Sequence, residues 1–301
     1  MKRIGFLSAV SLLIVAVSPG QALNGLKWRN IGPFRAGRVS AVAGVPGNPA
    51  VYYMGLPQGG VWKTTSAGQT WFPVFDAVQA TSSIGSIQVA PSNPTVVYAG
   101  TGEISGGSEG AGVYRSDDGG TTWRLLGLEG TSIIPAILVD PRDANTVLVA
   151  ALGEGAPSDQ RGVFRSSDGG KTWAKTLYVD NEIGIQHLAW AYDRPSVVFA
   201  LSQRRVPRPG PAKPGEKVPT GTDIYRSTDQ GLHWEKLATT GLPEIDGRCT
   251  IAVAQGTDSQ RLYLIGVFGL YRSDDGGASW RRMAADDRRI ANGQGYYTSG
   301  V

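Results

Sequence analysis

The chain has 301 residues, of which 41% are hydrophobic and 18% charged, and a formal net charge of +4 at pH 7. Lys2 and Arg3 lie in a leader-like segment, so the mature chain would carry +2, too little for a nucleic-acid-binding surface. Cys249 is the only cysteine, which excludes an intramolecular disulfide, and the 42 glycines favour a fold of many short strands and turns.

The first 22 residues have the pattern of a secretory signal peptide. Two basic residues are followed by an apolar run over residues 4–17, and Gly20 and Ala22 supply the small side chains of a cleavage site. The sequence therefore predicts a secreted or periplasmic protein. An uncleaved anchor is the alternative, although the apolar run is short for a membrane span. After cleavage no transmembrane segment is expected.

Pairs of strand-like runs follow, each pair divided by a short turn rich in proline, asparagine or aspartate. No helical period separates them. In chain order the first three predicted pairs are Val39–Val45 with Ala50–Met54, Ile84–Ala90 with Thr95–Ala99, and Ile133–Val139 with Thr146–Ala151.

An octapeptide ending in tryptophan comes after each pair, and it recurs five times. A lead-in triplet of an aliphatic, an aromatic and a basic residue precedes every copy. Successive tryptophans are 52, 50, 61 and 46 residues apart, which indicates an array of one supersecondary unit. The copies are TTSAGQTW (64–71), SDDGGTTW (116–123), SSDGGKTW (166–173), STDQGLHW (227–234) and SDDGGASW (273–280).

The two upstream runs, the triplet and the residues after the tryptophan give four strands per unit, here named A to D. Four antiparallel strands in a repeat of about 50 residues are typical of a β-propeller blade. The sequence therefore predicts an all-β protein with five visible blades over residues 23–301. The chain continues after Trp280 towards a further strand A, so we expect an incomplete, N-terminal part of a larger propeller. A closed five-bladed ring is the alternative.

The octapeptide is predicted to join strands C and D as a hairpin. Its glycines suit positive φ, its aspartate can accept hydrogen bonds from the turn, and its tryptophan can pack into the blade. This predicts a structural role rather than catalysis, and Ser66 stands in the aspartate position of the first copy. The residues assigned this role are Asp118, Asp168, Asp229, Asp275, Trp71, Trp123, Trp173, Trp234 and Trp280.

The octapeptides resemble Asp-boxes, also called BNR repeats. Together with WRNIGPFRAGRVSAVAG (28–44) and GGVWKTTSAGQTW (59–71), they resemble the bacterial sortilin/xyloglucanase-like group, whose glycosyl hydrolase members share the repeat. The resemblance implies a propeller, but Asp-box propellers have unrelated activities. In xyloglucanases of the group a catalytic aspartate precedes the Gly-Gly before strand C, and here Pro57 occupies that position. The second catalytic aspartate lies in a second propeller, which this sequence lacks.

Candidate ligand residues lie at the end of the blades that carries the B–C and D–A loops, here called the loop face. Loops that vary on a rigid scaffold commonly hold binding sites. Glu103 and Glu154 are expected to lie where these loops open to solvent. The basic, proline-rich segment 204–219 is interpreted as a surface loop or as a basic arm. The candidate residues are Glu103, Glu154, Arg204, Asp180, Glu182 and Asp246.

We therefore expect an exported propeller that binds a glycan or a peptide on its loop face. A xyloglucanase-like or sialidase-like glycoside hydrolase fragment is the first alternative, and a scaffold or assembly factor is the second. No cofactor is expected. No metal site is expected either, because His187 and His233 are the only histidines and neither lies in a ligand cluster.

Overall fold

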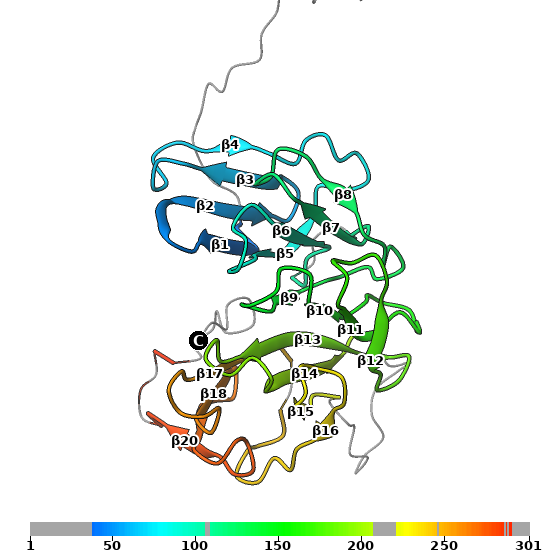
Figure 1. Cartoon of the computed structure of the whole chain (residues 1–301). Helices are drawn as coiled ribbons and strands as arrows, with labels where there is room; N and C mark the ends of the chain where they lie inside the picture. Colours follow the sequence, from blue (N-terminus) through cyan, green and yellow to red (C-terminus); the bar gives the residue numbers. More distant parts are fainter. Residues whose placement is uncertain are drawn as a thin grey trace, which may run out of the picture. The chain divides into compact units, whose positions relative to one another are not determined.

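The computed structural model describes residues 38–105, 109–206, 221–245, 247–285, 287 and 289–290. Within these ranges there is no helix, and all strands fall into five four-stranded antiparallel sheets (Figure 1). Each sheet is a blade in which consecutive strands pair. The strands are β1 (Ala41–Val45), β2 (Asn48–Leu56), β3 (Gly60–Thr64) and β4 (Phe72–Pro73) in blade 1; β5 (Ile84–Val89), β6 (Val97–Thr101), β7 (Val113–Ser116) and β8 (Arg124–Leu125) in blade 2; β9 (Ala136–Val139), β10 (Val147–Ala151), β11 (Gly162–Ser166) and β12 (Ala174–Leu177) in blade 3; β13 (Ile183–Trp190), β14 (Val198–Arg204), β15 (Ile224–Ser227) and β16 (Glu235–Lys236) in blade 4; β17 (Cys249–Val253), β18 (Leu262–Gly266), β19 (Gly269–Ser273) and β20 (Arg281–Met283) in blade 5.

The predicted strands agree with the observed ones to within a few residues. The second strand of blade 2 begins at Val97 rather than at Thr95. Thr95 belongs to the preceding turn, where its hydroxyl donates to Asn93 Oδ1 over 2.8 Å and its carbonyl accepts the backbone N–H of Gly119. The tryptophan of each octapeptide does not begin strand D but directly precedes it.

The buried centre of every Asp-box is the hydroxyl of its first residue. In the third box Ser166 Oγ accepts the backbone N–H of Gly170 over 2.9 Å and donates to Asp168 Oδ1 over 2.7 Å. The same contact from the fifth N–H to the first hydroxyl occurs in all five boxes, with lengths between 2.7 and 3.0 Å. The first residues are Thr64, Ser116, Ser166, Ser227 and Ser273, and all are buried.

The box aspartate closes the second half of the turn. Asp168 accepts the backbone N–H of Thr172 over 3.0 Å and its hydroxyl over 2.7 Å. Hydrogen bonds from the equivalent threonine of the second box, first from its side chain and then from its backbone, lower the pKa of Asp118 from 3.8 to about 2. In the first box, which has no aspartate, Ser66 Oγ accepts the equivalent backbone N–H of Thr70 over 3.0 Å. The box aspartates therefore accept hydrogen bonds within their own turns.

The lead-in triplet alternates between the two sides of a blade. We call the side that packs on the preceding blade the leading side, and the side that packs on the following blade the trailing side. Val113 of blade 2 and Phe164 of blade 3 lie in one hydrophobic cluster, and Ile224 of blade 4 and Tyr271 of blade 5 lie in another. The aliphatic residue therefore belongs to the trailing side and the aromatic residue to the leading side.

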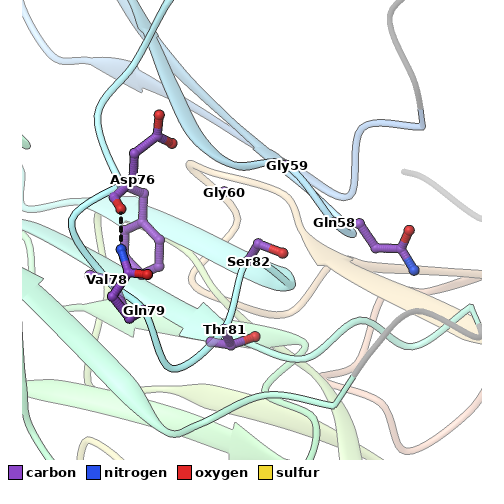
Figure 2. Close-up of a pocket in the computed structure, with 9 residues that line it drawn as sticks. Gln58, Gly59, Gly60, Asp76, Val78, Gln79, Thr81 and Ser82 are labelled. Atoms are coloured by element: carbon purple, nitrogen blue, oxygen red, sulfur yellow. Dashed lines mark hydrogen bonds between the residues drawn. The ribbon is translucent and has the colours of Figure 1, made fainter. Parts of the chain in front are cut away.

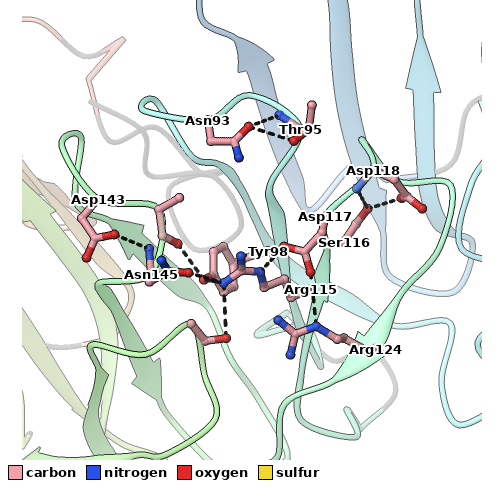
Figure 3. A network of polar contacts seen from close by, with 12 residues as sticks. Asn93, Thr95, Tyr98, Arg115, Ser116, Asp117, Asp118, Arg124, Asp143 and Asn145 are labelled. Carbon is pink, nitrogen blue, oxygen red and sulfur yellow. Dashed lines mark hydrogen bonds and ion pairs between the residues drawn. The ribbon is translucent and has the colours of Figure 1, made fainter.

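The basic residue of the triplet reaches the next Asp-box. Arg115 donates to Asn145 Oδ1 over 2.9 Å and to the Gly169 carbonyl over 3.4 Å, and both acceptors belong to blade 3 (Figure 3). The tryptophans that end the second, third and fourth boxes point the other way, because each donates its indole N–H to the preceding blade. Trp173 Nε1, for example, donates over 2.8 Å to the carbonyl of Leu126 in blade 2. The basic residues of three other triplets also donate to the carbonyl of the fourth residue in the next box. Lys63 donates to Gly119, Arg165 to Gln230 and Arg226 to Gly276.

These contacts predict that the box serine contributes more to stability than its neighbour. Ser166→Ala should lower the free energy of unfolding by about 1–3 kcal/mol, because it leaves the buried N–H of Gly170 without its acceptor. Ser167→Ala is a matched control at an exposed position of the same turn and should change the free energy by less than about 0.5 kcal/mol. Urea denaturation of both variants measures the difference, and equal losses would contradict the assignment.

Candidate functional site

The loop face is formed where strand A begins and strand B ends, because the two strands are antiparallel. Arg248 directly precedes strand β17 in a D–A connection, and Arg38 lies three residues before the start of strand β1. Glu103 and Glu154 follow strands β6 and β10 in two B–C loops. The topology thus places side chains of opposite charge at the same end of the molecule, away from the Asp-boxes.

From the sequence we expected Glu103 to lie in a loop open to solvent, and this expectation is wrong. Its side chain is only 4% exposed and forms an ion pair of 2.5 Å with Arg38 Nη2. Its other carboxylate oxygen accepts the backbone N–H of Ser105 over 2.8 Å. The sequence does not reveal this burial, because the carboxylate of Glu103 pairs with the guanidinium of Arg38, which is 65 residues away in the sequence.

Glu154 is partly exposed, with 40% of its side chain accessible, and pairs with Arg205 Nη2 over 2.5 Å. The same Arg205 nitrogen approaches the carbonyl of Ile104 at 3.4 Å, which links blade 4 to the B–C loop of blade 2. The Nε atoms of Arg204 and Arg205 are buried and have no hydrogen-bond partner within the described part of the chain.

Ser105 contacts Arg38 and one further arginine, Arg248. Its carbonyl accepts Arg38 Nη1 over 3.2 Å, and its hydroxyl accepts Arg248 Nη1 from blade 5. Residues of all five blades therefore meet on the loop face, and three guanidinium groups face two carboxylates. We call this group the arginine cluster, which consists of Arg38, Glu103, Ser105, Glu154, Arg205 and Arg248.

The other predicted ligand residues form a separate group beside the cluster. Arg204 forms an ion pair with Glu182, and both side chains keep partial exposure. Asp180 Oδ1 accepts the backbone N–H groups of Glu182 and Ile183, each over 2.7 Å, so this oxygen shapes the D–A loop before β13. Asp246 and residues 207–219 of the basic segment lie outside the described residues.

His187 on β13 adds a neutral polar group near Arg248. Burial, and then the charge of the Arg248 guanidinium, lower the pKa of His187 from 6.5 to about 4. Its Nδ1 atom is buried without a hydrogen-bond partner among the described residues, although the residue as a whole is partly exposed. At neutral pH the imidazole is therefore uncharged and leaves the charge of the arginine cluster unchanged.

A pocket of 470 Å³ lies on the loop face of blade 1 (Figure 2). It is bounded by the B–C turn at Gly59 and Gly60 and by the connection from β4 to β5. Gln79 Nε2 donates to the Asp76 carbonyl over 2.9 Å on one side, and Gln58 lies on the other. Asp76 is the one acidic residue among the described residues that line it, so the pocket holds no carboxylate pair of the kind glycoside hydrolysis requires.

Comparing the ends of strand B brought Glu103 and Glu154 forward but did not bring forward Arg38 and Arg248. Arg248 directly precedes a strand A and Arg38 lies three residues before one, so comparing the residues before strand A across repeats, as was done for the ends of strand B, would have brought them forward. Ser105 offered no such signal, because its role depends on a loop conformation. No group of three potential metal ligands occurs among the described residues, and no helix there could cross a membrane.

Comparison with known proteins agrees with the fold. The family profile of the BNR/Asp-box repeat matches residues 114–125, which include the second box. The repeats and the five four-stranded blades define a β-propeller of the Asp-box type. Among the curated proteins no sequence matches the chain.

Several solved structures share the fold at low sequence identity. The GH74 xyloglucanase from Xanthomonas campestris has a TM-score of 0.61 and 19% identity over 86% of this chain and 40% of its own. An ancestral GH74 enzyme has a TM-score of 0.60 and 22% identity over 81% and 33%. YCF48 bound to D1 peptide has a TM-score of 0.52 and 18% identity over 84% and 69%. The chain thus spans less than half the length of the two GH74 enzymes, and these likenesses concern the fold alone.

Proposed function

We propose that the chain is an exported propeller that binds a peptide or glycan ligand on its loop face, and that the arginine cluster receives an anionic group of this ligand. The observation that carries the proposal is the convergence of side chains from all five blades on Ser105 and its neighbours. Groups brought together from so many elements form a site whose geometry is fixed by the scaffold.

The charge of the cluster indicates the chemistry of the ligand. Arg38, Arg205 and Arg248 exceed the two glutamates by one positive charge. Guanidinium groups bind carboxylates and phosphates through charge-assisted hydrogen bonds. Arg205 also has an unused buried Nε donor, and its partner Glu154 is exposed enough for an incoming anion to replace it.

A peptide carboxylate is the anionic group that we favour. The structural neighbour YCF48 is bound to a peptide, which supports a peptide on a propeller of this kind. Export is supported by the signal-like residues 1–22. The GH74 neighbours instead support a glycan, and an acidic sugar would present the same carboxylate chemistry to the cluster.

Glycoside hydrolysis fits the described residues less well. It needs two carboxyl groups that face each other across a sugar, about 5 to 9.5 Å apart. Glu103 and Glu154 are each turned onto an arginine, and Pro57 stands where the resemblance places a catalytic aspartate. A scaffold role would use the same surface for a protein partner.

Two substitutions with opposite expected effects test the proposal. Arg205→Gln should weaken binding of peptides with a free carboxyl end by at least about tenfold, because a charge-assisted contact is lost. Glu154→Gln should strengthen the same binding, because the competing carboxylate is removed while the shape is kept. Peptide arrays with free and amidated ends, and arrays of neutral and acidic oligosaccharides, measure the affinities.

Lys171→Gln is the matched control. It removes one positive charge from an exposed residue of the third Asp-box, at the opposite end of the blade. Its affinities should equal those of the unchanged chain. Equal affinity of all four proteins for every probe would refute the proposal, and binding that is insensitive to amidation would refute the part concerning the carboxylate.

A further inference from the structure

The B–C loop of blade 2 contacts all three arginines of the arginine cluster through Glu103–Ser105, which we call the inner segment. The carboxylate of its first residue pairs with Arg38, and the carbonyl of its second accepts Arg205 Nη2 over 3.4 Å. The carbonyl of its third residue accepts Arg38, and the hydroxyl of that residue accepts Arg248. A carboxylate beside backbone carbonyls is also the set of acceptors that an acidic peptide would present to these guanidinium groups.

The arginines that contact the inner segment belong to other blades, unlike the arginine that holds the next B–C loop. In blade 3, Arg161 directly precedes β11, is completely buried, and donates to two carbonyls of its own B–C loop. Ala111 stands at the equivalent position of blade 2, two residues before the lead-in triplet. The inner segment thus depends on guanidinium groups from blades 1, 4 and 5, which are the groups that we assign to the ligand.

The two ends of this loop are fixed to the scaffold. The backbone N–H of Gly102 donates to the Ser83 carbonyl over 2.9 Å, and that of Gly110 donates to the Ser132 carbonyl over 2.8 Å. Gly102 has φ of 81°, and a Cβ atom there would overlap the carbonyl oxygen of Ser132, so this close approach requires glycine. The ends of the loop therefore keep their place whether or not the inner segment contacts the arginines.

The inner segment itself is anchored by one apolar side chain. Ile104 lies with Ile133 and Leu152 in a small hydrophobic cluster, whereas the clusters between neighbouring blades are far larger. The ion pair of the segment is partly open to solvent, because the Arg38 side chain is 45% exposed, and water therefore competes for this contact. Few contacts are lost when the inner segment moves away, and the interfaces between the blades are unaffected.

We propose that the inner segment is an intramolecular ligand, which occupies the arginine cluster in the free protein and is displaced by an acidic peptide. This inference rests on the proposed function, because it requires that the cluster binds an anionic ligand. The guanidinium groups exchange one carboxylate and its neighbouring carbonyls for another set of the same chemistry. The affinity for the peptide is therefore reduced in proportion to the fraction of molecules in which the cluster is free.

Ile104→Ser tests the displacement without changing any charge. It removes the apolar anchor, so the exchange of the Ser105 amide hydrogen, which is bonded to Glu103, should accelerate at least about tenfold. The probe is the acetylated and amidated tripeptide Glu-Ile-Ser, which has the sequence of the inner segment. It should bind the variant at least about tenfold more tightly than the unchanged chain in an NMR titration. The same tripeptide with glutamine in place of glutamate should bind both proteins at least about tenfold more weakly.

Two further variants complete the experiment. Glu103→Gln removes the competing carboxylate, keeps the shape of the side chain, and should strengthen binding of the probe in the same direction as Ile104→Ser. Val267→Ser changes an exposed apolar residue in the B–C turn of blade 5, on the same face, and should bind like the unchanged chain. Circular dichroism and thermal melting confirm that each variant is folded.

The outcomes separate this inference from the proposed function. Equal affinity of the unchanged chain, Ile104→Ser and Glu103→Gln for the glutamate tripeptide overturns the intramolecular ligand but leaves an anion-binding cluster in place. Equal affinity of both tripeptides for the variants shows that the carboxylate is not what the cluster recognises, and overturns it as well. If none of the proteins binds either tripeptide, the proposed function fails and this inference fails with it.

Discussion

Trp280→Ala is expected to lower the free energy of unfolding by about 3–5 kcal/mol, the usual cost of truncating a buried tryptophan. The side chain is 6% exposed and lies with Leu262, Leu264 and Tyr271 in the cluster between blades 4 and 5. Its removal would leave a cavity in the hydrophobic interface between blades 4 and 5. Urea denaturation followed by tryptophan fluorescence and circular dichroism measures the loss.

Trp71→Ala is the matched comparison, because Trp71 occupies the same position in the first box. Its indole contact with Gly68 is exposed, and no preceding blade covers it among the described residues. We expect a loss of about 1 kcal/mol or less. Losses of the same size in both variants would show that the tryptophan acts within its turn and not between blades.

The fold could be predicted because its signals are local and repeated. The octapeptide needs positive φ at its fourth and fifth residues, and glycine supplies it in most copies. Ala67 and Gln230 adopt the same conformation in the fourth position, at φ of 53° and 60°, so the turn forms even where the preferred residue is missing. A motif with this tolerance remains recognisable at the same spacing in every blade.

The sequence did not show which residues of the octapeptide are buried and therefore contribute most to stability. The aspartates stand out in the sequence, but the structure shows that Ser166 is buried whereas Asp168 forms its contacts at the surface. Burial depends on the neighbouring blade, which no single repeat encodes. The same reason explains why the lead-in triplet was recognised as a pattern while its alternation between two sides was not.

The candidate site was predicted only in part. The alignment of strand ends brought Glu103 and Glu154 forward, and both belong to the arginine cluster. Their partners Arg38 and Arg205 are 65 and 51 residues away in the sequence, and pairing over such separations follows from how the blades pack. The exposure expected for Glu103 was wrong for the same reason.

Arg161 is another residue that no sequence motif identified. It directly precedes β11 and is completely buried, and its guanidinium donates to three backbone carbonyls among the described residues. Two of the acceptors, Leu152 and Ala156, belong to the B–C loop that carries Glu154, and the third, Asn181, belongs to the next D–A loop, at 3.0 Å from Nε. Burial lowers the pKa of the Arg161 guanidinium from its usual range, and the nearby Glu154 opposes this effect.

Arg161→Leu should therefore lower the free energy of unfolding by about 1–3 kcal/mol, because an apolar side chain remains while the buried carbonyl of Leu152 and two partly exposed carbonyls lose their donor. Amide hydrogen exchange of residues 152–158 should accelerate more than that of the Asp-box of the same blade. Arg281→Leu, at an exposed position, should stay within about 0.5 kcal/mol. If Arg161→Leu leaves both the stability and the exchange of this loop unchanged, Arg161 does not hold the loop in place, and the position of Glu154 must be fixed by its contact with Arg205 alone.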